Sequence, residues 1–189
     1  MSLKKLALII CLAMPLLAGG AEPFRLTSPD FPANGQMPEQ FVYNAEGCTG
    51  GNVSPELRWS GAPAGTRSFV VTLFDADEHA TPSGWWHWIL FDIPGSSTGL
   101  ARGAGMPHAS TLPKGAVHGR GDDGTESYSG PCPEPRDPAH RYVFTVYALK
   151  VDKLPVAPGS SGAMVSYAVH EFTLAKATLI ARHRNRAAH

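Results

Sequence analysis

Three stretches decide the fold: SFVVTLFD at residues 68–75, WWHWILFDI at 85–93 and RYVFTVYAL at 141–149. Each is a nearly continuous apolar run rich in β-branched and aromatic side chains, which is typical of a buried strand. Residues 163–176 carry apolar side chains at helical spacing and predict one helix, and residues 177–181 predict a last strand. The sequence therefore predicts a mainly β domain with one late helix.

Shorter segments predict further strands at residues 24–27, 41–43 and 57–59. Residues 47–55 are glycine-rich and irregular, and no helix follows them, which argues against a phosphate-binding loop. Residues 96–138 form a long polar region with many Gly and Pro residues. Because it is too long for an ordinary connection, we expect a functional surface region that contains some short strands.

The composition sets limits on the class of protein. The chain has 189 residues, of which 43% are hydrophobic, so it can bury a core as one domain. Lys plus Arg and Asp plus Glu both number 16, which argues against a nucleic-acid partner held by bulk charge. With 20 Gly and 17 Pro, the chain is typical of short strands and many turns rather than of a helical bundle.

The first 21 residues have the pattern of a signal peptide. Lys4 and Lys5 precede an apolar run over residues 6–17, and the small residues 18–21 follow it. We expect cleavage after Ala21 in a bacterial cell, which places the remaining chain in the periplasm or outside the cell. The apolar run is too short to span a bilayer comfortably, so stable membrane insertion is not expected.

Two alternatives to the signal peptide fit these residues less well. A lipoprotein anchor would use Cys11, but bulky Ile10 precedes it, and a buried N-terminal helix fits the flanking residues poorly. Cleavage leaves residues 22–189 as one domain, and the loss of two lysines changes the net charge from 0 to −2. Cys48 and Cys132 then remain, and in an exported chain they indicate one disulfide, with two free buried thiols as the alternative.

The alternation of side chains along a strand predicts which residues share a face. In residues 85–93, His87 should lie with Trp85 and Ile89, while Trp86 and Trp88 point the other way. In residues 141–149, alternate aromatic and aliphatic side chains starting from Tyr142 should share one face, with His140 at the entrance of the strand.

Four polar residues thus lie at or near the ends of the three predicted core strands: Asp75, His87, His140 and Tyr142. If those ends converge, imidazole N–H and phenol O–H groups form a pocket that favours phosphate or carboxylate. The Asp75 carboxylate could fix a histidine tautomer and raise the histidine pKa. The alternative is that each side chain is a satisfied polar residue at a strand end.

Other chemistry has weaker support. Asp75 and Asp77 with His79 and His87 could suggest a metal site, but no metal-binding spacing is present and no metal is expected. GSSTG at residues 95–99 matches the serine-hydrolase pattern G-x-S-x-G, yet a nucleophile elbow needs a helix next, and the following residues cannot supply one. Two further groups are interpreted as a surface turn and a solvated basic end: Asp122-Asp123-Gly124, and Arg182, Arg184 and Arg186.

Four motifs stand out together: DAD at residues 75–77, GWWHW at 84–88, GPCP at 130–133 and HRYVFTVYAL at 140–149. Three further segments accompany them: GCTGGNVSP at 47–55, WSGAPAGT at 59–66 and SSGAMV at 160–165. Together these motifs resemble the phosphatidylethanolamine-binding protein family, most closely its bacterial Raf-kinase-inhibitor-like branch of the YbhB/YbcL type. The resemblance covers essentially the whole of residues 22–189.

The resemblance implies a sandwich of two antiparallel sheets with a small cavity that accepts phosphate, phosphorylated head groups or carboxylates. The ligand-binding positions it implies are Asp75, His87, Cys132, Pro133, His140 and Tyr142. The cysteine pair resembles that of exported members, which supports a Cys48–Cys132 disulfide. The family implies neither a cofactor nor a general catalytic reaction, and its members bind ligands or inhibit partner proteins.

The sequence departs from the family at two places near the expected pocket. The family's D-P-D-A-P reads DADEH at residues 75–79, so both prolines are lost and Glu78 and His79 end the segment. Glu134 stands where a second proline is common. These changes bear on loop geometry and ligand choice, and Glu134 could repel an anion. The leading hypothesis is a non-catalytic anion-binding protein, monomeric or homodimeric. The alternatives are a module that inhibits a kinase or protease through residues 96–138, and a weak hydrolase that uses the His and Asp side chains.

Overall fold

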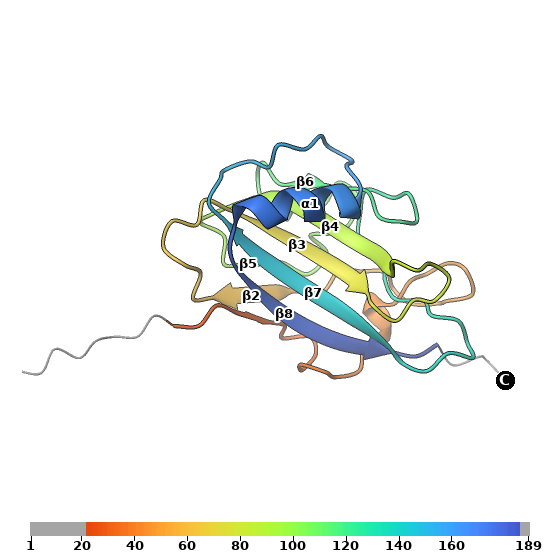
Figure 1. The fold of residues 1–189 in the computed structure, drawn as a ribbon. Helices are drawn as coiled ribbons and strands as arrows, with labels where there is room; N and C mark the ends of the chain where they lie inside the picture. Colours follow the sequence, from red (N-terminus) through yellow and green to blue (C-terminus); the bar gives the residue numbers. More distant parts are fainter. Residues whose placement is uncertain (1–21, 186–189) are drawn as a thin grey trace, which may run out of the picture.

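The three apolar stretches form neighbouring strands of one antiparallel sheet in the computed structural model, which describes residues 22–185 (Figure 1). They are β3 (Ser68–Asp75), β4 (Trp85–Pro94) and β7 (His140–Leu149). β6 (Val117–His118) and β8 (Thr173–His183) complete the sheet in the order β6-β4-β3-β7-β8. Because β3 lies in the middle with both faces covered, nearly all of its side chains are buried, and its sequence is accordingly apolar.

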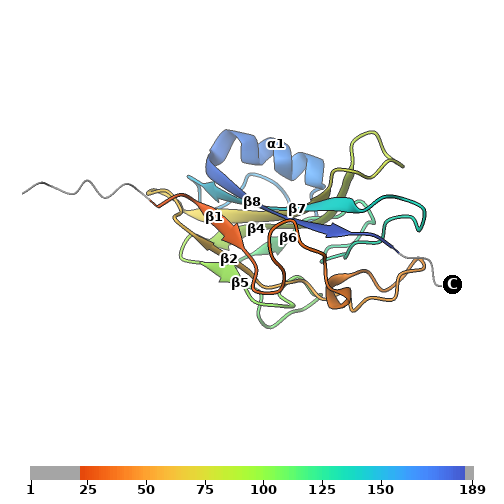
Figure 2. The same cartoon turned by 90° about the horizontal axis from the view of Figure 1, so that it is seen from below.

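A second, three-stranded antiparallel sheet packs against the inner face of the large one (Figure 2). Its strands are β1 (Arg25–Thr27), β2 (Leu57–Ser60) and β5 (Gly99–Leu100), in the order β1-β2-β5. The two layers confirm the expected mainly β sandwich of two antiparallel sheets. The core between the layers contains, among others, the fully buried side chains of Phe69, Leu73, Trp88, Tyr142 and Phe144.

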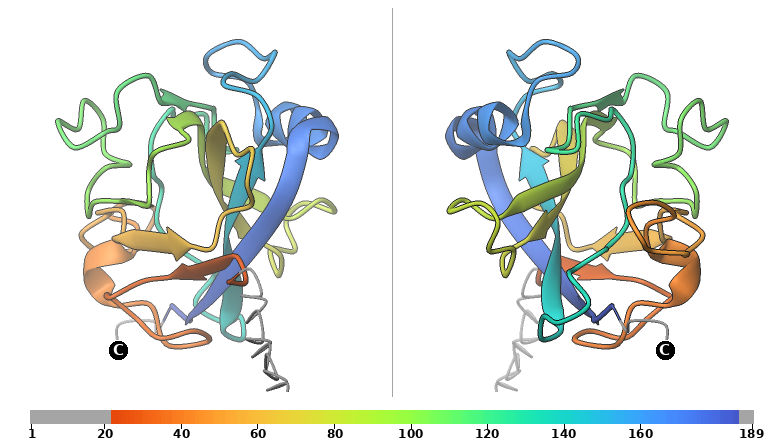
Figure 3. Two further views of the ribbon diagram at one scale, coloured as in Figure 1. Left: turned by 90° about the vertical axis from the view of Figure 1, so that its left-hand side faces the viewer. Right: turned by 90° about the vertical axis from the view of Figure 1, so that its right-hand side faces the viewer.

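One α-helix, α1 (Gly162–Phe172), covers part of the outer face of the large sheet, on the side away from the small sheet (Figure 3). The Ser161 hydroxyl caps its first turn by accepting a hydrogen bond from the Met164 backbone N–H at 3.3 Å. Met164 itself is exposed, and the buried positions of the helix are Gly162, Val165, Ala168 and Val169. The helix therefore closes a second, smaller core on the outer face of the sheet.

The predicted helix over residues 163–176 was too long, and the predicted strand over 177–181 was too short. β8 begins at Thr173, directly after the helix, and Lys176 already pairs with Tyr147 of β7. The apolar spacing of this segment suits a helix as well as a strand. Pairing with the full length of β7 satisfies its backbone hydrogen bonds, and this tertiary interaction decides between the two.

The strand predicted over residues 41–43 was also wrong. A short 3-10 turn, Glu39–Phe41, follows Pro38 there, and it places the Phe41 side chain fully in the core. The strands expected over 24–27 and 57–59 are confirmed as β1 and β2. The long region over 96–138 contains the short strands β5 and β6, as expected.

A β-bulge interrupts β4 where it pairs with the end of β3. Leu73 pairs with Trp88 and Phe74 pairs with Trp86, so His87 is an additional residue between two consecutive pairs. Such a residue breaks the alternation of side chains along the strand.

The predicted faces of this segment were therefore wrong. Trp86 packs against the helix-side core together with Ile89, whereas Trp88 lies in the core between the sheets. His87 does not share a face with Ile89, and its ring lies beside Tyr142 on the sandwich side. The bulge is what turns this histidine toward the polar residues of β3 and β7.

The signal peptide and the alternative anchor at Cys11 concern residues 1–21, which lie outside the described residues, as does Arg186 of the basic end. Within residues 22–185, no helix has the length and apolarity that a membrane crossing requires.

Candidate functional site

Four polar side chains from three central strands meet at one end of the large sheet. Asp75 ends β3 and lies directly opposite Tyr142 of β7, so the two side chains share a face. His140, the first residue of β7, joins its Nδ1 to Asp75 Oδ2 at 2.8 Å. The His87 ring lies edge-on to Tyr142, with 5.4 Å between ring centroids. The structure thus brings together the four residues that the strand ends had suggested.

These side chains are buried, and several of their polar atoms lack hydrogen-bond partners. The exposed fractions are 1% for Asp75, 6% for His87 and 0% for both His140 and Tyr142. Among the described residues, no partner is present for either ring nitrogen of His87, for His140 Nε2 or for the Tyr142 hydroxyl. Buried polar atoms in proteins are normally paired. Four unpaired atoms on three neighbouring side chains therefore indicate a place where a ligand or water binds.

Burial dominates the electrostatics of His87 and Tyr142. Desolvation lowers the pKa of His87, and the negative charge of Asp75 only partly opposes this shift. The expectation that the carboxylate would raise a histidine pKa therefore does not hold for His87, which is a neutral imidazole at pH 7. Burial, followed by the charge of Asp75, raises the pKa of the Tyr142 phenol, so Tyr142 stays a hydroxyl donor.

Cys132 and Pro133 lie on the long loop between β6 and β7, which passes the His87 bulge. The Ser129 N–H donates to the His87 carbonyl at 3.1 Å, and the two loop residues follow shortly after this contact. Cys132 forms a disulfide with Cys48, and their Cα atoms lie 5.9 Å apart. Pro133 is buried. The hydrogen bond at Ser129 and the disulfide at Cys132 therefore hold this part of the loop in place.

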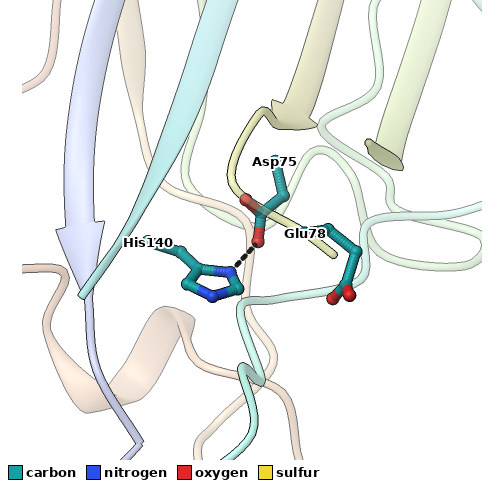
Figure 4. Close-up of side chains that lie close together, drawn as sticks. All are labelled: Asp75, Glu78 and His140. Carbon is teal, nitrogen blue, oxygen red and sulfur yellow. Dashed lines mark hydrogen bonds and ion pairs between the residues drawn. The ribbon is translucent and has the colours of Figure 1, made fainter. Parts of the chain in front are cut away.

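The acidic residues around the site fall into two groups. Asp77 is held by Arg141, whose Nη2 lies 2.6 Å from Asp77 Oδ1, and this guanidinium lowers the pKa of Asp77 to about 2. Among residues 22–185, Glu78 has no Lys or Arg partner, and its carboxylate lies near the Asp75–His140 pair (Figure 4). One ligand atom from each of these three residues lies within 4.8 Å of the others. Glu134, in contrast, is exposed.

The sequence reasoning missed Asp137. Its Oδ2 lies 3.4 Å from Nε2 of His140, although the geometry is not that of a hydrogen bond. The i, i+3 spacing to a singled-out histidine was the available signal, but the turn that presents this carboxylate belongs to an irregular loop. The closeness of Glu78 was also unforeseen, although the residue itself was noted as a departure.

A cleft of about 1030 Å³ lies next to the site, beside the disulfide. Its lining residues include Gln36, Glu39, Cys48, Pro135, Ala139 and His183. Ala139 directly precedes His140, and His183 pairs with His140 across β7 and β8. The cleft therefore borders the strand end that carries the polar group, while the four polar side chains themselves are absent from its lining.

The hydrolase motif lies elsewhere. GSSTG at residues 95–99 follows the far end of β4, where Pro94 pairs with Ser68 at the start of β3, opposite the end that carries Asp75. The short strand β5 begins at Gly99, the last residue of this motif, where a nucleophile elbow needs a helix, so no such elbow is formed. Asp122 and Asp123 form a turn, as expected.

Fold and site together define a two-sheet β-sandwich with a buried polar group at one end of its large sheet. The family model described as phosphatidylethanolamine-binding protein matches residues 27–184. This chain belongs to that family and to its YbhB/YbcL type.

Three relatives illustrate the similarity. The UPF0098 protein YbcL of Escherichia coli K12 is 42% identical over 177 residues, which cover 94% of this chain and 96% of YbcL. The UPF0098 protein YbhB of the same strain is 41% identical over 157 residues, covering 83% and 98%. A Mycobacterium tuberculosis protein named as a candidate lipoprotein, LppC, is 33% identical, covering 86% and 73%. The crystal structure of E. coli YbcL matches with a TM-score of 0.83 over 86% of this chain and 99% of that chain.

Proposed function

We propose that this protein is an exported, non-catalytic binding protein whose pocket at Asp75, His87, His140 and Tyr142 takes phosphate, a phosphorylated head group or a carboxylate. The observation that carries the proposal is the set of buried, unpartnered polar atoms on the two histidines and the tyrosine. Leaving such an atom unpaired costs about 1–3 kcal/mol, and an anion that accepts hydrogen bonds from these groups would recover that energy.

The rest of the site supports this role. Asp75 accepts a hydrogen bond from His140 Nδ1 and so orients the ring. His87, kept neutral by burial, offers an N–H donor, and Tyr142 offers its hydroxyl. The buried Pro133 and the disulfide-anchored Cys132 would shape the rim. The proposed pocket therefore relies on oriented neutral donors more than on net positive charge.

Export has independent support. The disulfide Cys48–Cys132 suits an oxidising compartment, and one relative is named as a candidate lipoprotein. The alignment with YbcL spans 177 residues, more than the 168 that follow position 21, so the likeness extends into the proposed signal peptide. Fractionation of cells that produce the full chain tests this: a periplasmic or secreted form beginning at Glu22 is expected, and a full-length cytoplasmic form would refute it.

The non-catalytic part of the proposal rests on the position of potential nucleophiles. The GSSTG serines lie at the far end of β4, and the Cys132 sulfur is held in the disulfide. Turnover of a phosphoester panel that depended on His87 would overturn this part.

Isothermal titration calorimetry with phosphate and phosphoethanolamine tests the pocket. The double variant His87→Ala/His140→Ala should lose binding, whereas His170→Ala on the exposed face of α1 should not. Equal heats for the double variant and the wild type would refute the pocket.

A milder variant separates binding from folding. Because the Tyr142 hydroxyl has no partner, Tyr142→Phe should leave the free energy of unfolding nearly unchanged while weakening phosphate binding by about tenfold. Tyr167→Phe, at an exposed tyrosine on α1, is the matched control and should change neither quantity. Unchanged affinity in Tyr142→Phe would remove the phenol from the pocket. If no small anion binds at all, a protein partner at residues 96–138 becomes the better hypothesis.

A further inference from the structure

One edge of the large sheet is only partly covered. β8 is the last strand of this sheet, so the edge opposite β7 is an outer border of the sheet (Figure 1). The segment over residues 34–37 runs along the C-terminal part of that edge. The Asn34 N–H donates to the Ile180 carbonyl at 2.7 Å, and the Arg182 N–H donates to the Gly35 carbonyl at 2.8 Å. The chain therefore already adds a short extended segment of its own to one part of the edge.

The neighbouring part of the edge, over residues 176–179, has no such partner. In an antiparallel ladder, both backbone groups of a residue point to the same side, and the side alternates along the strand. Because Ile180 and Arg182 point to the outer edge, Thr178 and Lys176 do so as well. In the described part of the chain, no backbone hydrogen bond is formed on this side by the N–H or carbonyl of Lys176 or Thr178. Such a row of unpaired groups can pair with an added strand.

The open stretch is held in an extended conformation and is accessible. β8 pairs with β7 along this stretch, and the inward side chains of Ala177 and Leu179 lie in the core between the sheets. The side chains of Lys176 and Thr178 are exposed. A partner strand would therefore meet backbone groups that are already in place, and β8 would lose little conformational entropy on binding.

The charge along this edge selects the kind of partner. Lys176 lies in the open stretch, Arg182 lies just beyond it, and both side chains are exposed. Within residues 22–185, neither of them forms an ion pair. No acidic residue occurs in β8 or in the neighbouring strand β7. An added strand that carries carboxylates beside Lys176 would gain opposite-charge pairs across the strands.

A second copy of the chain fits this edge less well. Two β8 strands that pair antiparallel over the open stretch bring their Lys176 side chains opposite or diagonal to each other, and like charges there are destabilising. A lysine on an edge strand is one way in which proteins prevent such self-pairing. The edge therefore favours a partner of opposite charge.

We propose that residues 176–179 of β8 form a docking edge for an extended acidic segment of another protein, which joins the five-stranded sheet as a sixth strand. Main-chain hydrogen bonds to Lys176 and Thr178 would supply the affinity, and the charge of Lys176 would supply the preference for acidic residues. The proposal does not depend on the anion pocket, because the two share no residue.

Titration calorimetry of the chain without residues 1–21 tests the edge with two peptides. The peptide acetyl-TVEVEVT-amide should bind, and acetyl-TVKVKVT-amide, which carries the opposite charge, should bind at least about tenfold more weakly. Lys176→Glu should reverse this preference. Thr178→Pro removes an outward N–H without removing a bond to β7, and it should weaken binding of the acidic peptide at least about tenfold. Thr178→Ala keeps the N–H, so it is the matched control and should bind like the wild type.

The outcomes decide the proposal. Equal affinity in Thr178→Pro and wild type, equal affinity for the two peptides, or no binding of either peptide overturns it. Binding that is lost in Thr178→Pro and retained in Thr178→Ala supports it, whether or not phosphate binds to the protein. A dimer in analytical ultracentrifugation that dissociates in Thr178→Pro would assign the edge to a second copy and overturn the acidic partner. Circular dichroism checks the fold of each variant, and Lys176→Glu, at an exposed side chain, keeps the test available if Thr178→Pro does not fold.

Discussion

The disulfide should supply a large share of the stability of this domain. Cys48 and Cys132 are 84 positions apart in the sequence, so their disulfide closes a long loop. It links the segment after the 3-10 turn to the loop that precedes β7. In the chain-entropy description, closing a loop of this length restricts the unfolded chain enough to contribute about 4.5 kcal/mol. The double variant Cys48→Ala/Cys132→Ala should therefore lose about that much free energy of unfolding.

Urea denaturation of the oxidised wild type, the reduced wild type and the double variant measures this effect. With about 2.1 cal/mol/K of unfolding entropy per residue, the same loss corresponds to a decrease in Tm of about 13 °C. The slope of the denaturation curve should rise in the two unlinked forms, because their unfolded chains expose more surface. Reductant added to the double variant is the control and should change nothing.

Two results would refute the reasoning. A difference below about 1 kcal/mol between oxidised and reduced wild type would mean that the unfolded chain is not restricted as the loop length requires. A loss in the double variant that far exceeded the loss on reduction would point to packing of the buried Cys48 side chain instead of the covalent link.

Three further predictions concern single side chains. Gly162→Ala should lower stability by about 1–3 kcal/mol in thermal unfolding, because its Cβ would lie 2.4 Å from the Trp86 indole; an unchanged Tm would contradict this packing. Asp77 has a pKa lowered to about 2 by Arg141, so its contribution is complete above the ordinary pKa of 3.8 and is lost as pH falls through about 2. The free energies of unfolding of wild type and Asp77→Asn should differ by about 1 kcal/mol at neutral pH, because solvent screens this half-exposed pair. The difference should disappear below pH 2, and a difference that stays constant with pH would exclude the ion pair as its cause. Tyr128→Phe should cost about 1–3 kcal/mol in urea denaturation, since its buried hydroxyl donates to a backbone carbonyl at 2.7 Å, and no cost would mean that water replaces it.

Much of the fold could be predicted from local sequence. The runs that became β3, β4 and β7 are apolar because both of their faces are covered, and this leaves a direct record in the residues. The segment after Phe172 could not be assigned in this way, because its apolar spacing is compatible with a helix and only pairing with β7 makes it a strand. The strand predicted over residues 41–43 was wrong for a similar reason. In the sequence, an aromatic residue that is buried from a 3-10 turn looks the same as one that is buried from a strand.

The candidate site was predictable in its members but not in its geometry. Asp75 and His140 were expected at strand ends and Tyr142 on one face of its strand, and β3 and β7 place them so. The orientation of His87 was not, because the bulge depends on the register between two strands. The approach of Glu78 to His140 was equally inaccessible, and the i, i+3 spacing of Asp137 gave only a weak signal, since both acidic residues lie in irregular segments whose paths depend on the whole fold.

The sequence by itself determined the strand-forming segments, the pair of cysteines available for a disulfide and the polar residues at the ends of the central strands. Each of these depends on residue type and local periodicity. Only the tertiary structure decided that four buried polar side chains would meet with unpaired atoms, and that three carboxylates would surround one histidine. These contacts join segments as far apart as Asp75 and His140, 65 positions along the chain, so they follow from strand register and loop path rather than from any local pattern.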